Sequence, residues 1–465
     1  MKRLPIVFFI IILMAACTLA KPTTEATPTQ AVTQIPTQTN TPTATVSPTP
    51  VPDLLYVDPS QDLGPISPYI FGSNYSVYGA VPVASMEAAL GSHVTAFRWP
   101  GGQWGNANDI QPFNLDAFIA FCRQTNALPT ISVRYQGGAP EKAAALVRYA
   151  NIEKGYKITY WSIGNEPDYE VENGKKIDPA DFNPRWRAIA QAMKAVDPTI
   201  KIMGPELSQW NGSISKTAKY PPIQTPASAR VDWMTEFLKA NGDLVDIVTV
   251  HRYPEYAPSS PVPITPATLR ENTLEWNQYV ILLRSLIHEI TGRDLPVAFT
   301  EVNSDPTPGV IGGSATPDSF YNAIWYADVL GRLIQERVFM VNQWVFAYRT
   351  GGLGLIFGSE LRPTYYVFQM YSHFGSEQVL ATSGVKYVTV YASKREDGTL
   401  TIMVINLLDT EQTVPLKVEG VSLSKAQGWL FDADHKAVDM GEQSFPPDGK
   451  LVLPAQSISL YALGK

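Results

Sequence analysis

The chain has 465 residues, of which 45% are hydrophobic and 17% are charged, and its formal net charge is -7. This length allows a large buried core and more than one domain. The acidic balance argues against nucleic-acid binding, because a nucleic-acid binder needs a basic face to neutralise phosphates.

Residues 1–17 have the composition of a signal peptide, in which a positively charged start precedes an apolar stretch at residues 4–14. That stretch is too short to span a bilayer. The small residues before Cys17 resemble the bacterial lipobox, and the resemblance implies that the Cys17 thiol is lipidated and becomes the new N-terminus. We therefore expect an extracytoplasmic protein that its lipid anchors to a bacterial membrane. Met14 is unusual at its lipobox position, which leaves ordinary secretion as the alternative.

Residues 18–52 consist mostly of Thr, Pro, Ala, Val and Gln. Such a segment cannot bury enough apolar surface to fold, and frequent proline keeps it extended. We expect a semi-rigid stalk between the membrane anchor and the globular part of the chain.

From Asp53 onward, short apolar runs alternate with amphipathic helices, which is the pattern of parallel βα units. Eight runs are expected to be strands: 69–74, 95–100, 130–135, 158–165, 200–206, 245–253, 296–303 and 339–346. Eight strands with helices between them over residues 53–375 have the size of a TIM barrel, so the predicted fold is α/β, a (β/α)8 barrel. Asn183 followed by Pro184 predicts the start of one of its helices.

After Gly375 the pattern changes to short alternating runs broken by turns. The runs are 385–392, 400–407, 413–418, 426–431 and 457–462. This pattern is typical of an antiparallel β-sandwich, which we expect over residues 376–465. The segment 54–57 precedes the barrel and is expected to add a strand to the same sandwich, whose role we expect to be bracing the barrel.

Two of the expected barrel strands end in a glutamate. The fourth ends in the sequence GNEP, which contains Asn165 and Glu166, and the seventh ends in TE, which contains Glu301. Functional side chains of a (β/α)8 barrel project from these strand ends, and strands four and seven lie on opposite sides of the mouth. Two carboxyl groups that flank one bond are what glycoside hydrolysis requires, since one protonates the leaving oxygen and the other attacks the anomeric carbon or activates water.

The GNEP and TE sequences at these two strand ends resemble the glycoside hydrolase clan A superfamily. The barrel with its appended sandwich resembles families 30, 39, 51 and 79. This resemblance implies a retaining glycosidase acting on extracellular poly- or oligosaccharides, with Glu166 as acid/base and Glu301 as nucleophile. It also implies that Asn165 binds the sugar 2-hydroxyl next to the scissile bond.

The same resemblance gives roles to residues at other strand ends. Arg98, in the sequence RWPGG after strand two, would orient the nucleophile. His251 and Tyr253 end strand six, and Tyr253 would hydrogen-bond the nucleophile. Trp344 on strand eight would floor the sugar subsite. Weaker candidates for sugar platforms are Trp99, Trp104, Trp210 and Tyr348.

The expected charges fit this assignment. Arg98 and Tyr253 beside Glu301 would favour its ionised, nucleophilic form. The negative charge of Glu301 would in turn keep the proton on Glu166 for donation to the leaving group.

Other chemistries find less support in the sequence. The chain has only two cysteines, Cys17 and Cys122, so it does not depend on a disulfide framework. Its five histidines are scattered without the spacing of a metal site, and no GxSxG sequence occurs. We therefore expect no metal and no organic cofactor, which argues against a metal-dependent barrel enzyme.

Several alternatives stay open at this level. Glu206, at the end of strand five, is the rival catalytic carboxylate. A second hypothesis is a non-catalytic surface protein that binds carbohydrate on a hydrolase-like scaffold. The sequence does not select the sugar, and endo or exo action depends on the loops 208–230 and 254–268. It predicts no protein partner.

Overall fold

The computed structural model describes residues 49–77, 81–172, 174–210, 233–254, 264–446 and 448–464. The expected signal peptide, Cys17 and nearly all of the expected stalk lie outside these residues. Most of the loops 208–230 and 254–268 also lies outside them. Among the described helices, none is long and apolar enough to cross a membrane.

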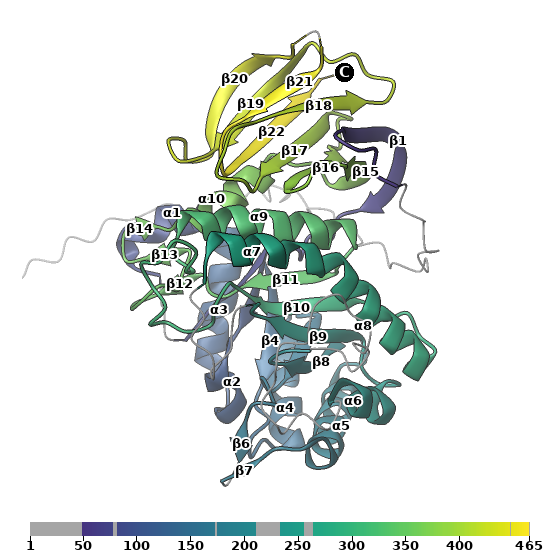
Figure 1. The fold of residues 1–465 in the computed structure, drawn as a ribbon. Helices are drawn as coiled ribbons and strands as arrows, with labels where there is room; N and C mark the ends of the chain where they lie inside the picture. Colours follow the sequence, from purple (N-terminus) through teal and green to yellow (C-terminus); the bar gives the residue numbers. More distant parts are fainter. Residues whose placement is uncertain are drawn as a thin grey trace, which may run out of the picture. The chain divides into compact units, whose positions relative to one another are not determined.

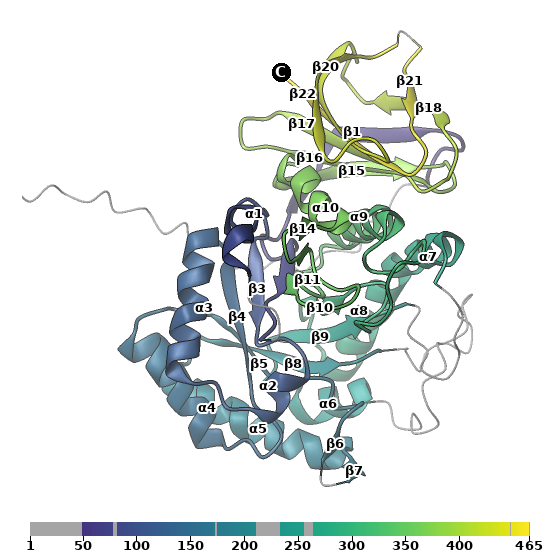
Figure 2. The ribbon, with the colours of Figure 1, turned by 90° about the vertical axis from the view of Figure 1, so that its left-hand side faces the viewer.

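Eight parallel strands close into a barrel in the order β10-β11-β2-β3-β4-β5-β8-β9 (Figures 1 and 2). They are β2 (Gly72–Asn74), β3 (Ala96–Trp99), β4 (Leu128–Val133), β5 (Tyr160–Ile163), β8 (Lys201–Leu207), β9 (Ile247–Arg252), β10 (Val297–Val302) and β11 (Met340–Gln343). Each overlaps one of the eight predicted runs. Parallel pairing of β11 with β2 closes the barrel, so the predicted (β/α)8 fold is confirmed.

Helices surround the barrel strands (Figure 2). They are α1 (Met86–Leu90), α2 (Gln103–Ala107), α3 (Pro112–Thr125), α4 (Pro140–Val147), α5 (Pro179–Val196), α6 (Trp233–Asn241), α7 (Pro266–Asn272), α8 (Trp276–Thr291), α9 (Phe320–Gln335) and α10 (Pro363–Ser372). The predicted start of α5 at Asn183 is wrong. The side chain of Asp178 caps this helix by accepting from the backbone N–H of Asp181, and Pro179 takes its first position.

Small strands lie outside the barrel. A two-stranded hairpin, β6 (Val171–Glu172) and β7 (Lys175–Lys176), follows β5. After β11, a three-stranded sheet contains β12 (Ala347–Tyr348), β13 (Ile356–Phe357) and β14 (Glu360–Leu361).

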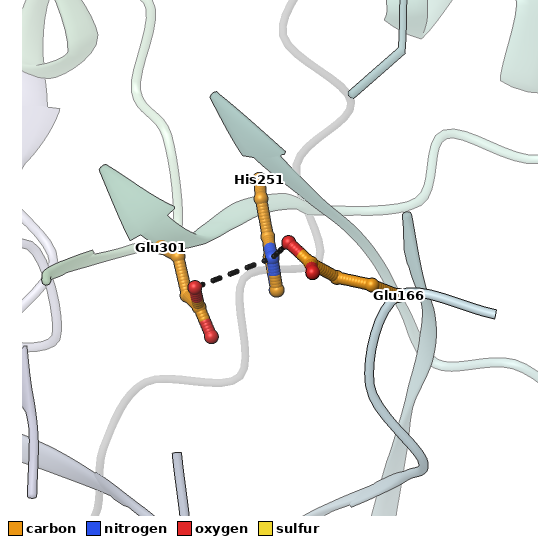
Figure 3. Close-up of side chains that lie close together, drawn as sticks. All are labelled: Glu166, His251 and Glu301. Atoms are coloured by element: carbon orange, nitrogen blue, oxygen red, sulfur yellow. Dashed lines mark hydrogen bonds and ion pairs between the residues drawn. The ribbon is translucent and has the colours of Figure 1, made fainter. Parts of the chain in front are cut away.

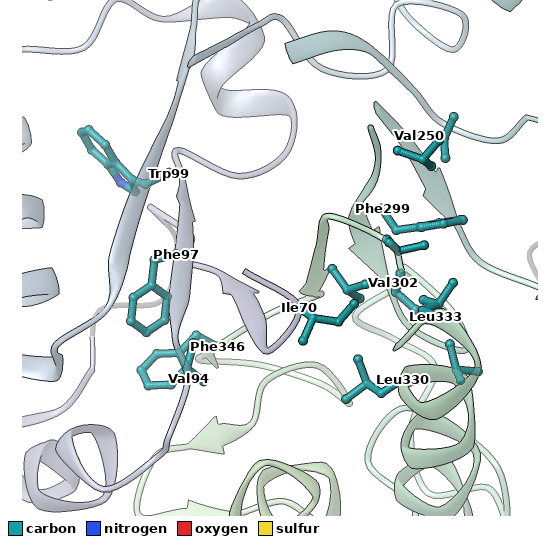
Figure 4. Close-up of a cluster of buried hydrophobic side chains, with 14 of the residues drawn as sticks. Ile70, Val94, Phe97, Trp99, Val250, Phe299, Val302, Leu330, Leu333 and Phe346 are labelled. Atoms are coloured by element: carbon teal, nitrogen blue, oxygen red, sulfur yellow. The ribbon is translucent and has the colours of Figure 1, made fainter. Parts of the chain in front are cut away.

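Side chains alternate along the barrel strands between two cores, because the side-chain period of a strand is two. Inward positions near the strand starts form a small apolar cluster of Tyr69, Ala96, Met203, Ile247, Ala298 and Met340. Outward positions pack against the surrounding elements. Figure 4 shows Phe299 and Val302 near Leu330 and Leu333 of α9, and Phe97 beside Phe346. The apolar cluster fills the barrel at the strand starts, so polar inward residues begin further along each strand.

The C-terminal part is a curled, mostly antiparallel sheet in the order β20-β19-β22-β17-β16-β15-β1-β18-β21. Its strands are β1 (Leu55–Pro65), β15 (Glu377–Ser383), β16 (Val388–Lys394), β17 (Leu400–Asn406), β18 (Gln412–Val418), β19 (Lys425–Phe431), β20 (Val438–Ser444), β21 (Lys450–Leu453) and β22 (Ser457–Leu463). The sequence missed β15, β20 and β21. The early strand β1 pairs antiparallel with β15 and parallel with β18, in the sheet where the segment 54–57 was expected.

A buried polar joint connects α9 to this sheet. The carboxylate of Asp328 accepts hydrogen bonds from the hydroxyls of Tyr391 and Thr389, each at 2.6 Å, and from Nε of Arg332 at 2.8 Å. The Tyr391 ring lies directly over Gly331, where a Cβ atom would overlap it. These contacts fit the expected role of the sheet in bracing the barrel.

We expect Gly331→Ala to destabilise the protein by about 1–3 kcal/mol, because the added methyl group forces the Tyr391 ring away from Asp328. Equilibrium urea denaturation measures this change. Gly309→Ala is the matched control, since a Cβ atom there would have no neighbour within 4 Å. An unfolding free energy of Gly331→Ala equal to that of the wild type would show that the joint is not tightly packed.

Candidate active site

Inward positions toward the C-terminal ends of the barrel strands carry charged and polar side chains. Arg98 follows the inward Ala96 on β3 at a spacing of two residues. On β9 the inward positions are Ile247, Thr249 and His251, each two residues from the last. Tyr253 follows the strand at the same spacing. The strand period therefore gathers these side chains at the barrel mouth.

Two strands change their pairing register where carboxylates lie. The register between β10 and β9 shifts between Phe299 and Glu301, and the register between β8 and β9 shifts around Glu206. Strict alternation would turn Glu301 outward with Phe299, so the bulge is what directs it into the mouth. Glu166 and Glu206 adopt left-handed backbone angles, φ 44 and φ 64. Such strain costs about 1–3 kcal/mol and clusters at functional sites.

Glu166, His251 and Glu301 lie together at the mouth (Figure 3). Nδ1 of His251 is 2.8 Å from Oε1 of Glu166 and 3.5 Å from Oε2 of Glu301. One carboxylate oxygen of each glutamate and one ring nitrogen of His251 all lie within 4.8 Å of one another. The Glu166 side chain is 17% exposed and that of Glu301 is 4% exposed. The structure thus brings the two predicted carboxylates into one site that reaches solvent on the Glu166 side.

Arg98 is fully buried and links several strands. Its Nη1 donates to Oε1 of Glu301 and to Oδ1 of Asn74, and its Nη2 donates to Oδ1 of Asn165, each at 2.9 Å. Nη2 also lies 3.4 Å from Oε2 of Glu206. Burial alone would lower the pKa of Arg98, but Glu206 and Glu301 raise it, so the guanidinium stays charged.

Tyr253 donates its hydroxyl hydrogen to Oε2 of Glu301 at 2.6 Å. Burial raises the pKa of Glu301, whereas His251 and Arg98 act in the opposite direction. The pKa of Glu301 is therefore raised overall, whereas the sequence predicted that its ionised form would be favoured. Removal of the carboxylate from water outweighs the effect of its donors. Both oxygens of Glu301 nevertheless accept hydrogen bonds, and the carboxylate is the form that accepts at both.

His251 is fully buried between carboxylates. Burial lowers the pKa of His251, but Glu301, Glu166 and Glu206 outweigh it and raise this pKa to about 10. The surrounding carboxylates therefore favour the doubly protonated imidazole at neutral pH.

Glu206, the rival catalytic carboxylate of the sequence analysis, is fully buried beneath the other two. Its Oε2 accepts from the Thr300 hydroxyl and lies 3.3 Å from Nε2 of His251. Burial raises the pKa of Glu206, but Arg98 and His251 outweigh that effect and lower it. A carboxylate without exposed surface cannot reach a substrate, so Glu206 acts only through its neighbours.

The indole of Trp344 packs over the Gly101-Gly102 turn that follows β3. A Cβ atom at Gly101 would lie 3.0 Å from Cζ3 of Trp344, and one at Gly102 would lie 2.7 Å from its Cη2. Gly102 also has φ 73, which glycine adopts without strain. Trp344 is half-buried. Its remaining exposed surface at the mouth fits the predicted floor of a sugar subsite.

Two proposed sugar platforms are core residues instead. Trp99 is 4% exposed and stacks on Phe118 of α3, with ring centroids 5.1 Å apart. Trp210 is 4% exposed and packs edge-on against Tyr279 of α8. The prediction that Trp99 contacts substrate is wrong, because its position next to the inward Arg98 turns it outward. Trp104 and Tyr348 are half-buried.

Three residues of the site were not predicted from the sequence. Asn74 donates from Nδ2 to the backbone oxygen of Thr300 at 2.9 Å, and Thr300 in turn donates to Glu206. Gln103, at the start of α2, donates from Nε2 to Oε2 of Glu166 at 3.4 Å. Asn74 ends the first barrel strand, so the inspection of strand ends that found Arg98 could have found it.

The described residues contain one group of three side chains with metal-ligand spacing, namely Glu166, His251 and Glu301. Arg98 already contacts Glu301 at 2.9 Å. His251 would have to lose a proton to bind a metal. The charges of this group therefore fit an ion-paired cluster better than a divalent cation site.

The chain is similar in sequence to several proteins of known activity. No protein-family model matches the chain. Alpha-L-arabinofuranosidase C of Emericella nidulans is 23% identical over 414 residues, which cover 76% of this chain and 77% of that protein. A beta-xylosidase of Geobacillus stearothermophilus is 24% identical over 271 residues, 53% of this chain and 47% of that protein.

Solved structures show the same fold. An alpha-L-arabinofuranosidase from Thermotoga maritima, in complex with arabinose, superposes with a TM-score of 0.70 at 20% identity, over 88% of this chain and 99% of that one. A Paenibacillus polymyxa xyloglucanase from glycoside hydrolase family 44 gives 0.67 at 16% identity, over 89% and 99%. The chain resembles the clan A glycoside hydrolases. The similarities support hydrolysis of a glycosidic bond.

We expect His251→Gln to lose more stability at pH 6 than at pH 10. The pKa of His251 is raised from 6.5 to about 10 in the folded protein, so its stabilisation is fully present below pH 6.5 and is lost as the pH rises through 10. Urea denaturation of wild type and variant across this range measures the difference. His288→Gln, at an exposed position on α8, is the control. A pH-independent difference would contradict a charged His251.

Proposed function

We propose that the protein is a retaining O-glycoside hydrolase that cleaves extracellular poly- or oligosaccharides by double displacement, with Glu166 as acid/base and Glu301 as nucleophile. The proposal is carried by the close approach of the two carboxylates, one oxygen of Glu166 lying within 4.8 Å of one oxygen of Glu301. Retaining enzymes hold these carboxyl groups about 5–5.5 Å apart, whereas inverting enzymes hold them about 6.5–9.5 Å apart to admit a water molecule.

In the first step, the Glu301 carboxylate attacks the anomeric carbon while Glu166 protonates the leaving oxygen. Arg98 and Tyr253 fix the two oxygens of Glu301 through hydrogen bonds of 2.9 and 2.6 Å. A fixed carboxylate approaches the anomeric carbon in one orientation, which lowers the entropic cost of attack. The product of this step is a glycosyl ester of Glu301.

In the second step, Glu166 accepts a proton from water, and the water oxygen attacks the same carbon. The glycosyl–Glu301 bond breaks, and the electron pair returns to the carboxylate. Two displacements at one centre restore its original configuration. In this scheme Asn165 binds the sugar 2-hydroxyl and Trp344 supplies a flat apolar surface for the ring.

No observation on the described residues favours the alternative of a non-catalytic carbohydrate-binding protein. Such a protein would not need two carboxylates that face one gap, nor the strained backbone at Glu166. The named relatives include arabinofuranosidases and a xylosidase. We therefore place aryl alpha-L-arabinofuranosides and beta-D-xylosides first in the substrate panel, before glucosides and glucuronides.

We expect Glu301→Gln to lower kcat on the best panel substrate by at least roughly 10³-fold, because the amide cannot act as the nucleophile. Proton NMR of the wild-type reaction at early times should show that the released sugar keeps its anomeric configuration. Glu289→Gln, at an exposed position on α8, is the matched control and should retain full activity.

Normal rates in Glu301→Gln would remove this residue from the mechanism. An inverted product would contradict the double displacement while leaving glycoside hydrolysis itself intact. Binding of panel glycans without product release by the wild type would favour the carbohydrate-binding alternative.

We also propose that the protein is exported and lipid-anchored through Cys17. The full-length chain, expressed in a bacterium, should partition into the detergent phase of a Triton X-114 extract, and Cys17→Ser should move it to the aqueous phase. Cys122→Ser provides the matched control, because Cys122 is buried on α3 and should not affect partitioning. Aqueous partitioning of the wild type would support ordinary secretion instead.

A further inference from the structure

Both ring nitrogens of His251 face carboxylates. Nδ1 lies 2.8 Å from Glu166, and Nε2 lies 3.3 Å from Glu206. A neutral imidazole has one donor and one acceptor nitrogen, so it fits both contacts only if one of the two carboxyl groups donates a proton to it. Glu301, Glu166 and Glu206 together raise the pKa of His251 to about 10, which favours the charged form. The imidazolium ion donates at both nitrogens and fits both contacts.

The charges of this buried cluster can be counted. Its two cations are Arg98 and His251, and the three carboxyl groups that contact these cations are Glu166, Glu206 and Glu301. Burial strongly disfavours a net charge. Neutrality therefore requires that one of the three carboxyl groups keeps its proton.

The contacts indicate which carboxyl group this is. Both oxygens of Glu301 accept from donors. Within the described part of the chain, Oε1 of Glu206 is buried without a hydrogen-bond partner, but Oε2 accepts from Thr300 and faces Arg98 and His251, and these two cations lower the pKa of Glu206 and hold it as the anion. Glu166 is the most exposed of the three, and among the described residues the donor to its Oε2 is the amide of Gln103, at 3.4 Å. It can carry a proton on Oε2 while Oε1 accepts from His251.

We propose that Glu206 is a positioning residue for this reaction: it is the second buried anion that balances Arg98 and His251, and it thereby leaves the one carboxyl proton of the cluster on Glu166. This inference rests on the proposed hydrolase function. It assigns to Glu206 a role in setting the protonation of the acid/base without any contact to substrate.

The cluster also has no net charge after the first chemical step. The bond between the anomeric carbon and the leaving oxygen breaks, a bond to Glu301 forms, and the proton of Glu166 moves to the leaving oxygen. Glu301 is then a neutral ester and Glu166 is an anion. The two cations still face two anions, so the cluster is neutral in both states because Glu206 contributes a constant negative charge.

The fold holds Glu206 in place from three strands. The backbone N–H of Glu206 donates to the Thr249 hydroxyl at 2.8 Å, and its backbone oxygen accepts from the N–H of Glu166 at 2.8 Å. Arg98 of β3 and Thr300 of β10 contact its side chain.

The titratable groups that face Glu166 are Asp168, Glu170, His251, Tyr253 and Glu301.

The test compares Glu206→Gln with Glu206→Asp in the full chain. Glu206→Gln removes the anion, so His251 and Glu166 compete for one proton. We expect the alkaline limb of the kcat/KM profile to move to lower pH by about one unit. We expect the loss of kcat/KM to be roughly 10²-fold greater on a phenyl glycoside, whose leaving group needs protonation, than on a 2,4-dinitrophenyl glycoside. Glu206→Asp keeps the charge and should keep the wild-type limb.

An equal loss on both substrates with an unchanged alkaline limb would overturn the proposal, because a purely structural role predicts that result. A second measurement needs neither activity nor a Glu206 variant. Long-range proton–nitrogen NMR of the wild type labelled with ¹⁵N-histidine, with His251→Gln to assign the signal, should show both nitrogens of His251 protonated at pH 8. A neutral His251 at pH 8 would refute the charge balance even if hydrolysis is confirmed, whereas an inactive wild type with a charged His251 would refute only the hydrolase function.

Discussion

Burial of charge at the barrel mouth is the constraint on which the rest of the site depends. Arg98, Glu206 and His251 have no exposed side-chain surface. A buried charge is tolerated only beside its opposite, and removal of one partner of a buried pair costs about 3–5 kcal/mol. Arg98 meets this requirement by contacts to Glu301, Glu206 and the Asn165 amide, so β3, β8, β10 and the end of β5 are tied together around one guanidinium.

The barrel could be predicted from the sequence because each strand is an apolar run bounded by helices, and all eight runs became strands. The positions of Arg98, His251 and Tyr253 followed from the strand ends for the same reason. Helix starts were less certain. The proline at residue 184 appeared to mark a start, whereas Asp178, with a side chain that can accept from the backbone, is the actual cap.

Three features of the site were not predicted from the sequence: the outward direction of Trp99, the register shift that turns Glu301 inward, and the role of Glu206. Alternation would have turned Trp99 outward from Arg98, and this error could have been avoided. The inward direction of Glu301 depends on a register shift in β10, which no residue pattern announces. The role of Glu206 was also hidden, because its contacts come from strands β3, β9 and β10 rather than from its own neighbours in the chain.

The position of β1 has a consequence for how this architecture can be divided. The first strand of the described chain lies between β15 and β18, in the interior of a sheet that the C-terminus completes. The barrel is therefore inserted, in the order of synthesis, between two parts of a single sheet. A ribosome releases the last strands of that sheet only after the whole barrel has emerged. The strand β1 therefore cannot pair until β15 and β18 have been synthesised. Recombination that exchanges the sheet as a simple C-terminal module would remove every partner of β1.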